Sequence, residues 1–467
     1  MSGTGSGTEE QAKGDVAVYV TTTSRSYDLK LMKVDFREDP YTLATTIKLK
    51  PTEKFQKMDG FGAALTGSSC YNLLKMRIED RTKFLTETYS PENFGFSYIR
   101  IAIGCSDFSL SEYTCWDNQN AGFALTSEEN DYVIPILKEI LAINPTIKIL
   151  GSPWTCPRWM KVNNLTDLQA HNSWTSGQLN PAHYGDYGDY FVKWIQAFET
   201  QGINIYAVTP QNEPLNRGNS ASLFMGWSEQ RDFLNQSLVP KIKAAGLATK
   251  IYLFDHNYNY DNMNDQNDYP VKIYNSGVDA QVVIGAAYHN YGGKRSELND
   301  IHTQYPNKEL IFSEASIGIW NDGRNLEKSL LRDMEELGLG TIDNWCKAVI
   351  VWNLMLDNDR GPNRDGGCQT CYGAVDIDNT NFKTIIRNSH YYVIAHLASV
   401  IKPGATRIGT SGFKATGIAY TAFTNADGSH ALVAINKNAV TQEVTIEDGK
   451  RHFTCTLPAK AVVSMKW

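Results

Sequence analysis

Two glutamates follow apolar runs in a pattern suited to acid–base and nucleophilic chemistry. The run 203–209 leads into Pro210-Gln211-Asn212-Glu213-Pro214, and the run 310–313 is followed directly by Glu314. Most acidic residues of a protein are solvated surface groups, and a single glutamate in such a position would be assigned to the surface. Two of them, each at the end of a buried strand, instead predict a pair of catalytic carboxyl groups.

Such a pair is what glycoside hydrolysis needs. One carboxyl group must protonate the departing oxygen and therefore needs a raised pKa, whereas the other must stay ionised to attack the anomeric carbon. We expect Glu314 to stay charged beside polar donors, and its charge to raise the pKa of Glu213. In an enzyme that retains the anomeric configuration, the two carboxyl groups lie about 5–5.5 Å apart.

The middle of the chain alternates short apolar runs with longer amphipathic segments. Eight runs with helical crossovers over roughly 330 residues predict an α/β fold, a (β/α)8 TIM barrel with insertions, in which catalytic side chains lie at the carboxyl ends of the strands. The predicted strands are 58–64, 98–103, 147–151, 203–209, 251–254, 282–288, 310–313 and 348–353. The predicted helices include 72–89, 127–143, 187–199, 228–245 and 326–337.

Both ends of the chain are extended in character and predict a separate β-sandwich. Near the C-terminus, Asp427-Gly428 and Asp448-Gly449 are typical hairpin turns between short apolar strands. These predicted strands are 418–423, 431–435, 443–446, 452–457 and 461–465. We therefore predict that residues 15–51 and 405–467 form a β-sandwich side domain, that 52–404 form the catalytic barrel, and that 1–14 form a disordered tether.

Composition excludes several classes of partner. The 467 residues are 42% hydrophobic and 20% charged, as in globular proteins, and 44 Lys+Arg against 51 Asp+Glu give a net charge of −7. A mildly acidic chain without a basic cluster is a poor ligand for nucleic acid or an anionic membrane. No run of about 18 apolar residues exists, so we expect no transmembrane segment.

The first ten residues are rich in Gly, Ser and Thr, and no signal peptide is visible. This segment indicates either a tether from which an export signal was removed or a remnant of an expression vector. We expect an exported protein, periplasmic, cell-surface or extracellular, that acts as a monomer.

Neither the cysteines nor the histidines form a recognisable metal site. Of eight cysteines, Cys368 and Cys371 form a CxxC pair in a glycine-rich loop, which favours a loop disulfide or free thiols over a metal. His289 lies near two acids in the predicted barrel, but no HxH or HExxH pattern occurs, and retaining glycosidases need no ion. We expect no metal and no cofactor.

Five short motifs together resemble glycoside hydrolase family 30, which contains the glucocerebrosidases and the microbial endo-β-1,6-glucanases. The similarity runs in order from about Met58 to the C-terminus. The motifs are Ser106-Asp107-Phe108-Ser109, Gly151-Ser152-Pro153-Trp154-Thr155, Asn212-Glu213-Pro214, His289-Asn290-Tyr291 and Ser313-Glu314-Ala315. Asn-Glu-Pro alone would indicate only the wider superfamily of retaining barrel glycosidases. The family's side β-sandwich, built from both chain ends, agrees with the strand pattern.

The resemblance implies a role for each matching residue at the reaction centre. Glu213 matches the acid/base, Glu314 the nucleophile, and Asn212 the residue that hydrogen-bonds the sugar 2-hydroxyl. His289 and Tyr291 match supports around the nucleophile, although a histidine at a strand end is more often simply packed.

The resemblance also implies a pocket for the sugar on the non-reducing side of the bond, the glycone. Asp107 and Trp154 match residues that hold its distal hydroxyls, and Trp352 matches an aromatic wall. Asp107 could instead cap a loop, and Trp154, between Pro153 and Pro157, could instead be a core residue. Three loop tryptophans are either core residues or the floors of further sugar subsites: Trp116, Trp159 and Trp320.

The resemblance therefore implies a retaining hydrolase of β-glucosidic bonds whose substrate is a β-glucan. An endo-β-1,6-glucanase is the first expectation and a glucosylceramidase the second. A non-catalytic glycan-binding barrel is a rival from another class, but both carboxyl groups are present. A phosphate-handling barrel or doubly wound sheet would need a glycine-rich phosphate loop, and neither Gly60-Phe61-Gly62-Ala63-Ala64 nor Gly366-Gly367 provides one.

Overall fold

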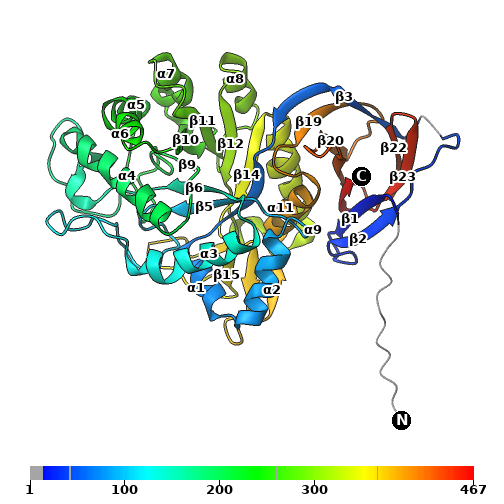
Figure 1. Cartoon of the computed structure of the whole chain (residues 1–467), viewed down its shortest axis with the longest axis horizontal. Coiled ribbons are helices and arrows are strands. Elements are labelled where there is room, and N and C mark those ends of the chain that lie inside the picture. The colour runs from blue at the N-terminus through cyan, green and yellow to red at the C-terminus, as the bar shows by residue number, and fades with distance from the viewer. Residues whose placement is uncertain (1–13, 42–43, 259, 365) are drawn as a thin grey trace, which may run out of the picture.

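The computed structural model describes residues 14–467 except 42–43, 259 and 365. Eight parallel strands close into a barrel, and a nine-stranded sheet forms a second body beside it (Figure 1). The predicted fold class is therefore confirmed. The predicted tether, residues 1–14, lies outside the described residues apart from Gly14.

All eight predicted barrel strands form, and each neighbours the next one along the barrel. They are β4 (Gly60–Ala64), β5 (Tyr98–Ala102), β6 (Lys148–Ser152), β9 (Ala207–Val208), β10 (Lys250–Asn257), β11 (Val283–His289), β12 (Glu309–Glu314) and β14 (Cys346–Val351). Short apolar runs predicted these strands correctly because parallel strands in a barrel are buried on both faces. Strand β9 is much shorter than its apolar run.

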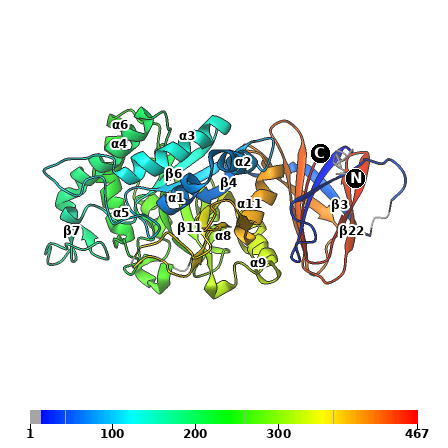
Figure 2. The same ribbon diagram turned by 90° about the horizontal axis from the view of Figure 1, so that it is seen from below.

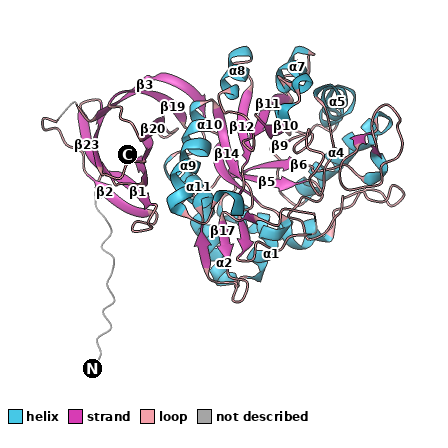
Figure 3. Ribbon diagram, turned by 180° about the vertical axis from the view of Figure 1, so that it is seen from behind, coloured by secondary structure: helices cyan, strands magenta, loops and turns pink. Residues whose placement is uncertain are grey.

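Helices cover the outside of the barrel, as Figures 2 and 3 show. They are α1 (Gly67–Lys75), α2 (Ile78–Tyr89), α3 (Ile134–Ile143), α4 (Tyr184–Thr200), α5 (Trp227–Phe233), α6 (Val239–Ala244), α7 (Tyr269–Asn275), α8 (Glu297–Gln304), α9 (Leu326–Asp333), α10 (Gly340–Asp343) and α11 (Ser389–Val400). The single helix predicted at 72–89 is wrong, because Met76 and Arg77 are extended and separate α1 from α2. Three predicted helices contain a π-helical stretch: η1 (Glu129–Val133), η4 (Leu234–Leu238) and η8 (Met334–Leu339).

The second body joins both chain ends in one sheet, in the order β2-β1-β24-β21-β20-β19-β3-β22-β23. Its strands are β1 (Val16–Thr22), β2 (Lys30–Val34), β3 (Thr46–Lys57), β19 (Thr406–Gly412), β20 (Ile418–Thr424), β21 (His430–Asn436), β22 (Gln442–Asp448), β23 (Arg451–Leu457) and β24 (Ala461–Lys466). Strand β3 continues past position 51 and pairs with β19 as far as Lys57. Gly428 and Gly449, in the two predicted hairpin turns, adopt positive φ. Strand β19 was not predicted, because its Thr, Ser and Gly residues show no apolar alternation.

Helix α11 connects the two bodies, and all twelve of its residues are buried. On this helix, His396 hydrogen-bonds the hydroxyl of Ser464 on β24 through Nδ1 and that of Thr21 on β1 through Nε2, each at 2.8 Å. Burial lowers the pKa of His396 to about 3, so the ring is neutral at pH 7. The two chain ends are therefore fastened to the barrel by one uncharged imidazole.

The barrel interior is filled, so a ligand can approach only at its ends. An apolar cluster of fully buried barrel residues consists of Tyr98, Leu150, Ala207, Tyr252, Ala287, Ile311, Ala348 and Ile350. Polar side chains then follow toward the carboxyl ends of the strands, where the site described below lies. Within the described part of the chain, no helix is long and apolar enough to cross a membrane.

Replacing His396 tests this junction. His396→Ala leaves two buried hydroxyls without their partner and opens a cavity, so we expect it to lower the free energy of unfolding by about 2–4 kcal/mol. Denaturant unfolding gives this value. His183→Ala, which removes a partly exposed pair with Asp186, is the matched control and should cost about 1 kcal/mol or less. Equal losses in the two variants would contradict the assigned role.

Candidate active site

A cavity of about 570 Å³ opens at the carboxyl end of the barrel. It gathers side chains that are far apart in the sequence, from the ends of seven different barrel strands. Seven of the eight predicted site residues line it: Asp107, Trp154, Asn212, Glu213, Tyr291, Glu314 and Trp352. The eighth, His289, is fully buried and contacts Glu213.

The two glutamates face each other across this cavity. Glu213 follows β9 and Glu314 ends β12, and a carboxylate oxygen of one lies within 4.8 Å of a carboxylate oxygen of the other. This separation agrees with the roughly 5–5.5 Å of retaining enzymes and is too short for inverting ones, which need about 6.5–9.5 Å. Glu213 has a φ of 45°, a conformation that is uncommon outside glycine and typical of functional sites.

A buried arginine that sequence reasoning missed holds these groups in place. Arg100 on β5 donates to Glu314 Oε2 at 2.5 Å, to Asp255 Oδ2 at 2.8 Å, to Asn212 Oδ1 at 2.6 Å and to Ser152 Oγ at 3.2 Å. Burial alone would lower the pKa of Arg100, but the Asp255 and Glu314 carboxylates raise it. Its position, as the one charged residue inside an apolar strand, could have indicated this role, because a buried charge needs a partner of opposite charge.

Asp255 on β10 is the second residue that was missed. Besides Arg100, it accepts hydrogen bonds from Thr209 Oγ1 at 2.7 Å, Ser313 Oγ at 2.5 Å and His289 Nε2 at 3.0 Å. Burial alone would raise the pKa of Asp255, but Arg100 and His289 hold it well below its usual range. Asp255 thus joins the ends of four strands through one permanently charged carboxylate.

The contact with Arg100 also fixes the orientation of Asn212. A guanidinium can only donate, so the atom of Asn212 that it meets must be the carbonyl oxygen. The Nδ2 amide group is then the part of Asn212 that can donate to a ligand in the cavity.

Glu213 is surrounded by donors. Asn216 and Asn219 donate to its Oε2 at 2.8 and 2.9 Å, and His289 Nδ1 lies 3.2 Å from its Oε1. Burial alone would raise the pKa of Glu213, but the hydrogen bond from His289, the nearby His256 and the hydrogen bond from Asn216 lower it to about 2. The prediction that Glu314 raises this pKa was therefore wrong for the free protein.

The proton that an acid would need resides on His289 instead. Burial alone would lower the pKa of His289, but the carboxylates of Glu314, Asp255 and Glu213 raise it to about 9. A protonated ring donates from both nitrogens, to Asp255 and to Glu213. Glu213 and His289 thus share one proton, which lies on the imidazole while the cavity is open to water.

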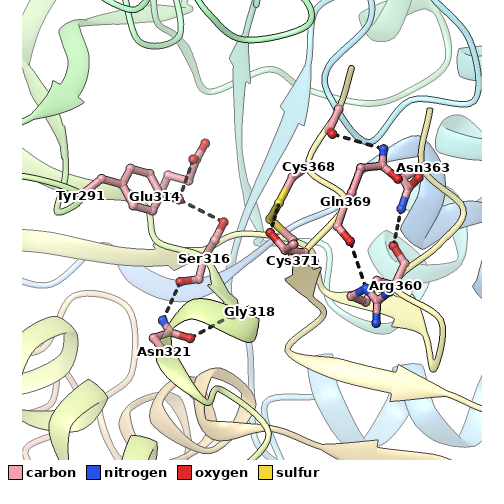
Figure 4. The surroundings of a disulfide bond; sticks show 12 residues. Tyr291, Glu314, Ser316, Gly318, Asn321, Arg360, Asn363, Cys368, Gln369 and Cys371 are labelled. Carbon is pink, nitrogen blue, oxygen red and sulfur yellow. Dashed lines mark hydrogen bonds between the residues drawn. A yellow bond between two sulfur atoms is a disulfide. The ribbon is translucent and has the colours of Figure 1, made fainter. Parts of the chain in front are cut away.

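Glu314 is oriented from the opposite side by Tyr291. The phenol donates to Glu314 Oε1 at 2.9 Å and lies 3.0 Å from Ser316 Oγ, as Figure 4 shows. Each carboxylate oxygen of Glu314 thus accepts a hydrogen bond, Oε1 from Tyr291 and Oε2 from Arg100. His289 Nδ1 is 4.0 Å from the same carboxylate, so of the two predicted supports only Tyr291 hydrogen-bonds it.

Two buried tryptophans form part of the cavity wall. Trp154 and Trp352 stack with ring centres 5.1 Å apart, and only 2% and 3% of their surfaces are exposed. The Arg100 guanidinium lies 4.9 Å from the centre of the Trp154 ring, which positions that ring further. Asp107 lies beside them, and burial and then the charge of Glu314 raise its pKa to about 7.

The loop tryptophans separate into two kinds. Trp320 lines the cavity and is 53% exposed. Trp116 and Trp159 instead pack against each other with ring centres 5.4 Å apart, and the Trp159 indole donates to the carbonyl of Trp116. Only Trp320 of the three is therefore placed to meet a sugar in this cavity.

The CxxC pair also belongs to the cavity wall. Cys368 and Cys371 line the cavity and are joined by a disulfide, which the sequence left open as one of two alternatives. Strand β16 (Cys371–Tyr372) pairs with β13 (Ile317–Gly318), a short strand soon after Glu314 (Figure 4). The disulfide loop is thereby fastened to the loop that follows Glu314.

Among the described residues, Glu213, His289 and Glu314 form one group with the spacing of metal ligands. Each already has partners: Asn216 and Asn219 for Glu213, Asp255 for His289, and Arg100 and Tyr291 for Glu314. These contacts explain the cluster without an ion. Metal-independent chemistry remains a prediction.

A TIM barrel with two close carboxylates at the ends of its fourth and seventh strands, beside an aromatic pocket, defines a retaining glycosidase. The TIM-barrel domain of glycosyl hydrolase family 30 matches residues 58–401, and the β-sandwich domain of that family matches residues 404–465. The chain belongs to glycoside hydrolase family 30, which confirms the resemblance seen in its motifs.

Individual relatives extend this comparison. The solved endo-β1,6-glucanase BT3312 is 64% identical, covers 97% of this chain and 99% of its own, and superposes with a TM-score of 0.95. Endo-1,6-β-D-glucanase BGN16.3 of Trichoderma harzianum is 33% identical over 402 residues, which are 82% of this chain and 78% of that protein. Lysosomal acid glucosylceramidase of Mus musculus is 26% identical over 90% of this chain and 83% of its own length.

The shared proton gives a test by pH. In the wild type, the alkaline limb of kcat/KM should follow the loss of that proton, as pH rises through the His289 pKa of about 9. In His289→Asn, only Glu213 can carry the proton, so the alkaline limb of kcat/KM for this variant should move to lower pH. Turnover of an aryl β-glucoside across pH measures both profiles. His302→Asn, on α8, should match the wild type, and an unmoved limb in His289→Asn would exclude the shared proton.

Proposed function

We propose that this protein is an endo-acting β-1,6-glucanase that cleaves with retention of configuration. The observation that carries this proposal is the pair of carboxylates within 4.8 Å in a cavity walled by buried tryptophans. The tryptophan wall suits the face of the glucosyl residue at the cleavage site, and endo action requires the chain to continue on both sides of the cleaved bond. Likeness to BT3312 over nearly the whole of both chains supports the choice of β-1,6-glucan.

In the first step, Glu314 attacks the anomeric carbon while Glu213 protonates the departing oxygen. Glu213 obtains that proton from His289 Nδ1, 3.2 Å away, and the ring is then neutral, with its Nε2–H still donating to Asp255. The bond from the anomeric carbon to the leaving oxygen breaks as the bond to Glu314 forms. The leaving sugar departs with the proton, and a glucosyl-enzyme remains.

In the second step, water takes the place of the leaving sugar. Glu213, now a carboxylate, accepts a proton from this water as its oxygen attacks the anomeric carbon, and Glu314 departs. The proton can pass back to His289, which restores the starting state. Asn212, through Nδ2, is placed to hydrogen-bond the sugar 2-hydroxyl, a contact that strengthens as the reacting sugar flattens.

The glycone is recognised by Asp107, Trp154 and Trp352. Aromatic faces stack on the apolar faces of a pyranose, and a buried carboxyl group selects the position of a hydroxyl, because a missing partner leaves it unpaired. Asparagines, among them Asn216 and Asn219, also line the cavity, and its exposed lining residues Tyr291 and Trp320 are aromatic rather than aliphatic. This lining favours a hydroxylated leaving group over the acyl chains of a glucosyl lipid, the substrate class of the glucosylceramidase alternative.

We also propose that the protein works outside the reducing cytoplasm. Disulfides persist in oxidising compartments and are rare in the cytosol, and Cys368–Cys371 is part of the cavity wall. An exported glucanase would meet polysaccharide before any cellular uptake.

The roles of the two glutamates are separable by chemical rescue. Glu314→Gln should be inactive on every substrate, because no nucleophile remains. Glu213→Ala should still form a glucosyl-enzyme from a substrate with a phenolate leaving group, with later steps slowed by about 10²–10⁴-fold. Azide should restore turnover of Glu213→Ala and give the β-glucosyl azide. Formation of the β-azide by the Glu314 variant, with none from the Glu213 variant, would show that the roles are reversed.

A substrate panel tests the specificity. β-1,6-Glucan should be cleaved to a series of oligosaccharides, whereas β-1,3- and β-1,4-glucans, glucosyl lipid, β-galactosides and β-xylosides should be poor substrates. Products are resolved by size, so endo and exo action are also distinguished. Asp107→Ala should narrow the preference for glucosides over galactosides. Efficient hydrolysis of glucosyl lipid without attack on β-1,6-glucan would refute the proposed substrate and leave the carboxylate chemistry intact.

A further inference from the structure

A second buried arginine joins three loops at the carboxyl end of the barrel. Arg364 lies in the loop that precedes β16, and only 9% of its surface is exposed. Its Nε donates to the carbonyl of Ser106 at 2.8 Å, in the loop after β5. Its Nη1 donates to Ser220 Oγ at 2.7 Å, in the loop after β9. The side chain thereby links the loop before β16 to the two loops that carry Asp107 and Glu213.

Two glycines let the same loop approach its neighbours closely. A Cβ at Gly367 would lie 2.3 Å from the carbonyl oxygen of Asp107, which is closer than two such atoms can approach. A Cβ at Gly366, whose φ is 80°, would lie 3.1 Å from Ser220 Oγ. The Gly366-Gly367 pair, which forms no phosphate loop, is therefore the point at which this loop packs on the backbone of Asp107.

Stability alone does not explain the position of Arg364. The guanidinium pairs with Glu112 at 3.0 Å, but the Glu112 side chain is 41% exposed, and a pair with so much contact with water contributes little. No described residue hydrogen-bonds the buried Nη2 of Arg364. A buried donor without an acceptor costs free energy, and native proteins keep such costs mainly where function requires them.

Arg364 also acts on Asp107 through its charge. Burial and the charge of Glu314 raise the pKa of Asp107 to about 7, whereas the charge of Arg364 opposes this shift. The same guanidinium therefore holds the backbone next to Asp107, through Ser106, and favours the ionised form of its carboxyl group. Both effects bear on a carboxyl group that lines the active-site cavity.

We propose that Arg364 is the positioning residue for selection of the glycone. It holds the loop that carries Asp107 at a fixed distance from the loop that carries Glu213. The carboxyl group that meets a hydroxyl of the sugar and the carboxyl group that donates the proton thus keep one relative geometry. Arg364 acts through Asp107 and does not touch the sugar itself. The inference rests on the proposed function, because that function assigns Asp107 to the glycone.

Discrimination between an aryl β-glucoside and the matching β-galactoside tests this role. The ratio of kcat/KM for the glucoside to kcat/KM for the galactoside should fall about tenfold in Arg364→Met, because a small displacement of a group that orients the substrate is costly. Arg364→Lys keeps the charge and one donor group, so it should recover part of the ratio. Arg360→Met is the matched control and should keep the wild-type ratio, because this arginine of the same loop donates to the carbonyl of Gln369 (Figure 4).

A double variant separates positioning from general destabilisation. If Arg364 acts through Asp107, adding Arg364→Met to Asp107→Ala should not lower the ratio further, because the selecting carboxyl group is already absent. General destabilisation would lower kcat/KM for both substrates equally and leave the ratio of Arg364→Met unchanged. Gly367→Ala keeps Arg364 but displaces the backbone of Asp107, so it should lower the ratio as well. That variant gives an answer even where Arg364→Met unfolds.

This inference and the proposed function fail in different ways. A wild-type ratio in Arg364→Met, in Gly367→Ala or in Asp107→Ala would overturn the positioning role and leave the β-1,6-glucanase proposal standing. A further fall on adding Arg364→Met to Asp107→Ala would do the same. A wild-type protein that hydrolyses neither the aryl β-glucoside nor β-1,6-glucan would overturn the proposed function and this inference with it.

Discussion

The catalytic end of the barrel depends on one buried guanidinium. Arg100 lies inside an apolar strand, where removing its charge from water is costly, and it is stabilised only by partners that surround it. Its four contacts reach β6, the loop after β9, β10 and the end of β12. Any displacement of these strand ends would leave a charge unpaired in the interior. The ion cluster therefore specifies the relative positions of Asn212, Asp255 and Glu314 more strictly than apolar packing would.

The charge balance of this cluster explains where its proton lies. Arg100 and a protonated His289 face three carboxylates, those of Asp255, Glu213 and Glu314. Without the proton on His289, three negative charges would share one buried cation, and the raised pKa of His289 reflects this imbalance. In the proposed mechanism, a sugar that fills the cavity expels the water near Glu213, which favours the neutral form of that carboxyl group. Substrate binding would thereby move the proton from His289 toward Glu213, the proposed acid.

The sequence predicted the fold well because its signals were local. Apolar runs marked all eight barrel strands, even though β9 forms only two residues of regular strand. The break between α1 and α2 was missed, because Met76 and Arg77 do not interrupt the amphipathic pattern as a proline or glycine would. β19 was missed because its composition resembles a loop.

The site was predicted only in part. Glutamates at strand ends were visible, and the motifs supplied the cavity-lining residues. Arg100 lies within its strand, and Asp255 belongs to none of the recognised motifs. A search restricted to the ends of the strands therefore did not find either residue. The pKa of Glu213 depends on His289, 76 residues away in the chain, on His256 and on the amide of Asn216. No spacing rule indicates that three-dimensional contact, which is why the direction of the shift was wrong.

Reaction chemistry and choice of leaving group are carried by different parts of the molecule. The charged cluster is built on barrel strands, whose positions are fixed by a closed sheet. Part of the cavity rim is built on the loops after β12 and β14, joined to each other by the β13–β16 pair and closed by the Cys368–Cys371 disulfide. Substitutions in these loops can change the shape of the rim without moving Arg100 or its partners. A barrel of this kind can therefore keep one reaction chemistry while its loops come to accept different leaving groups.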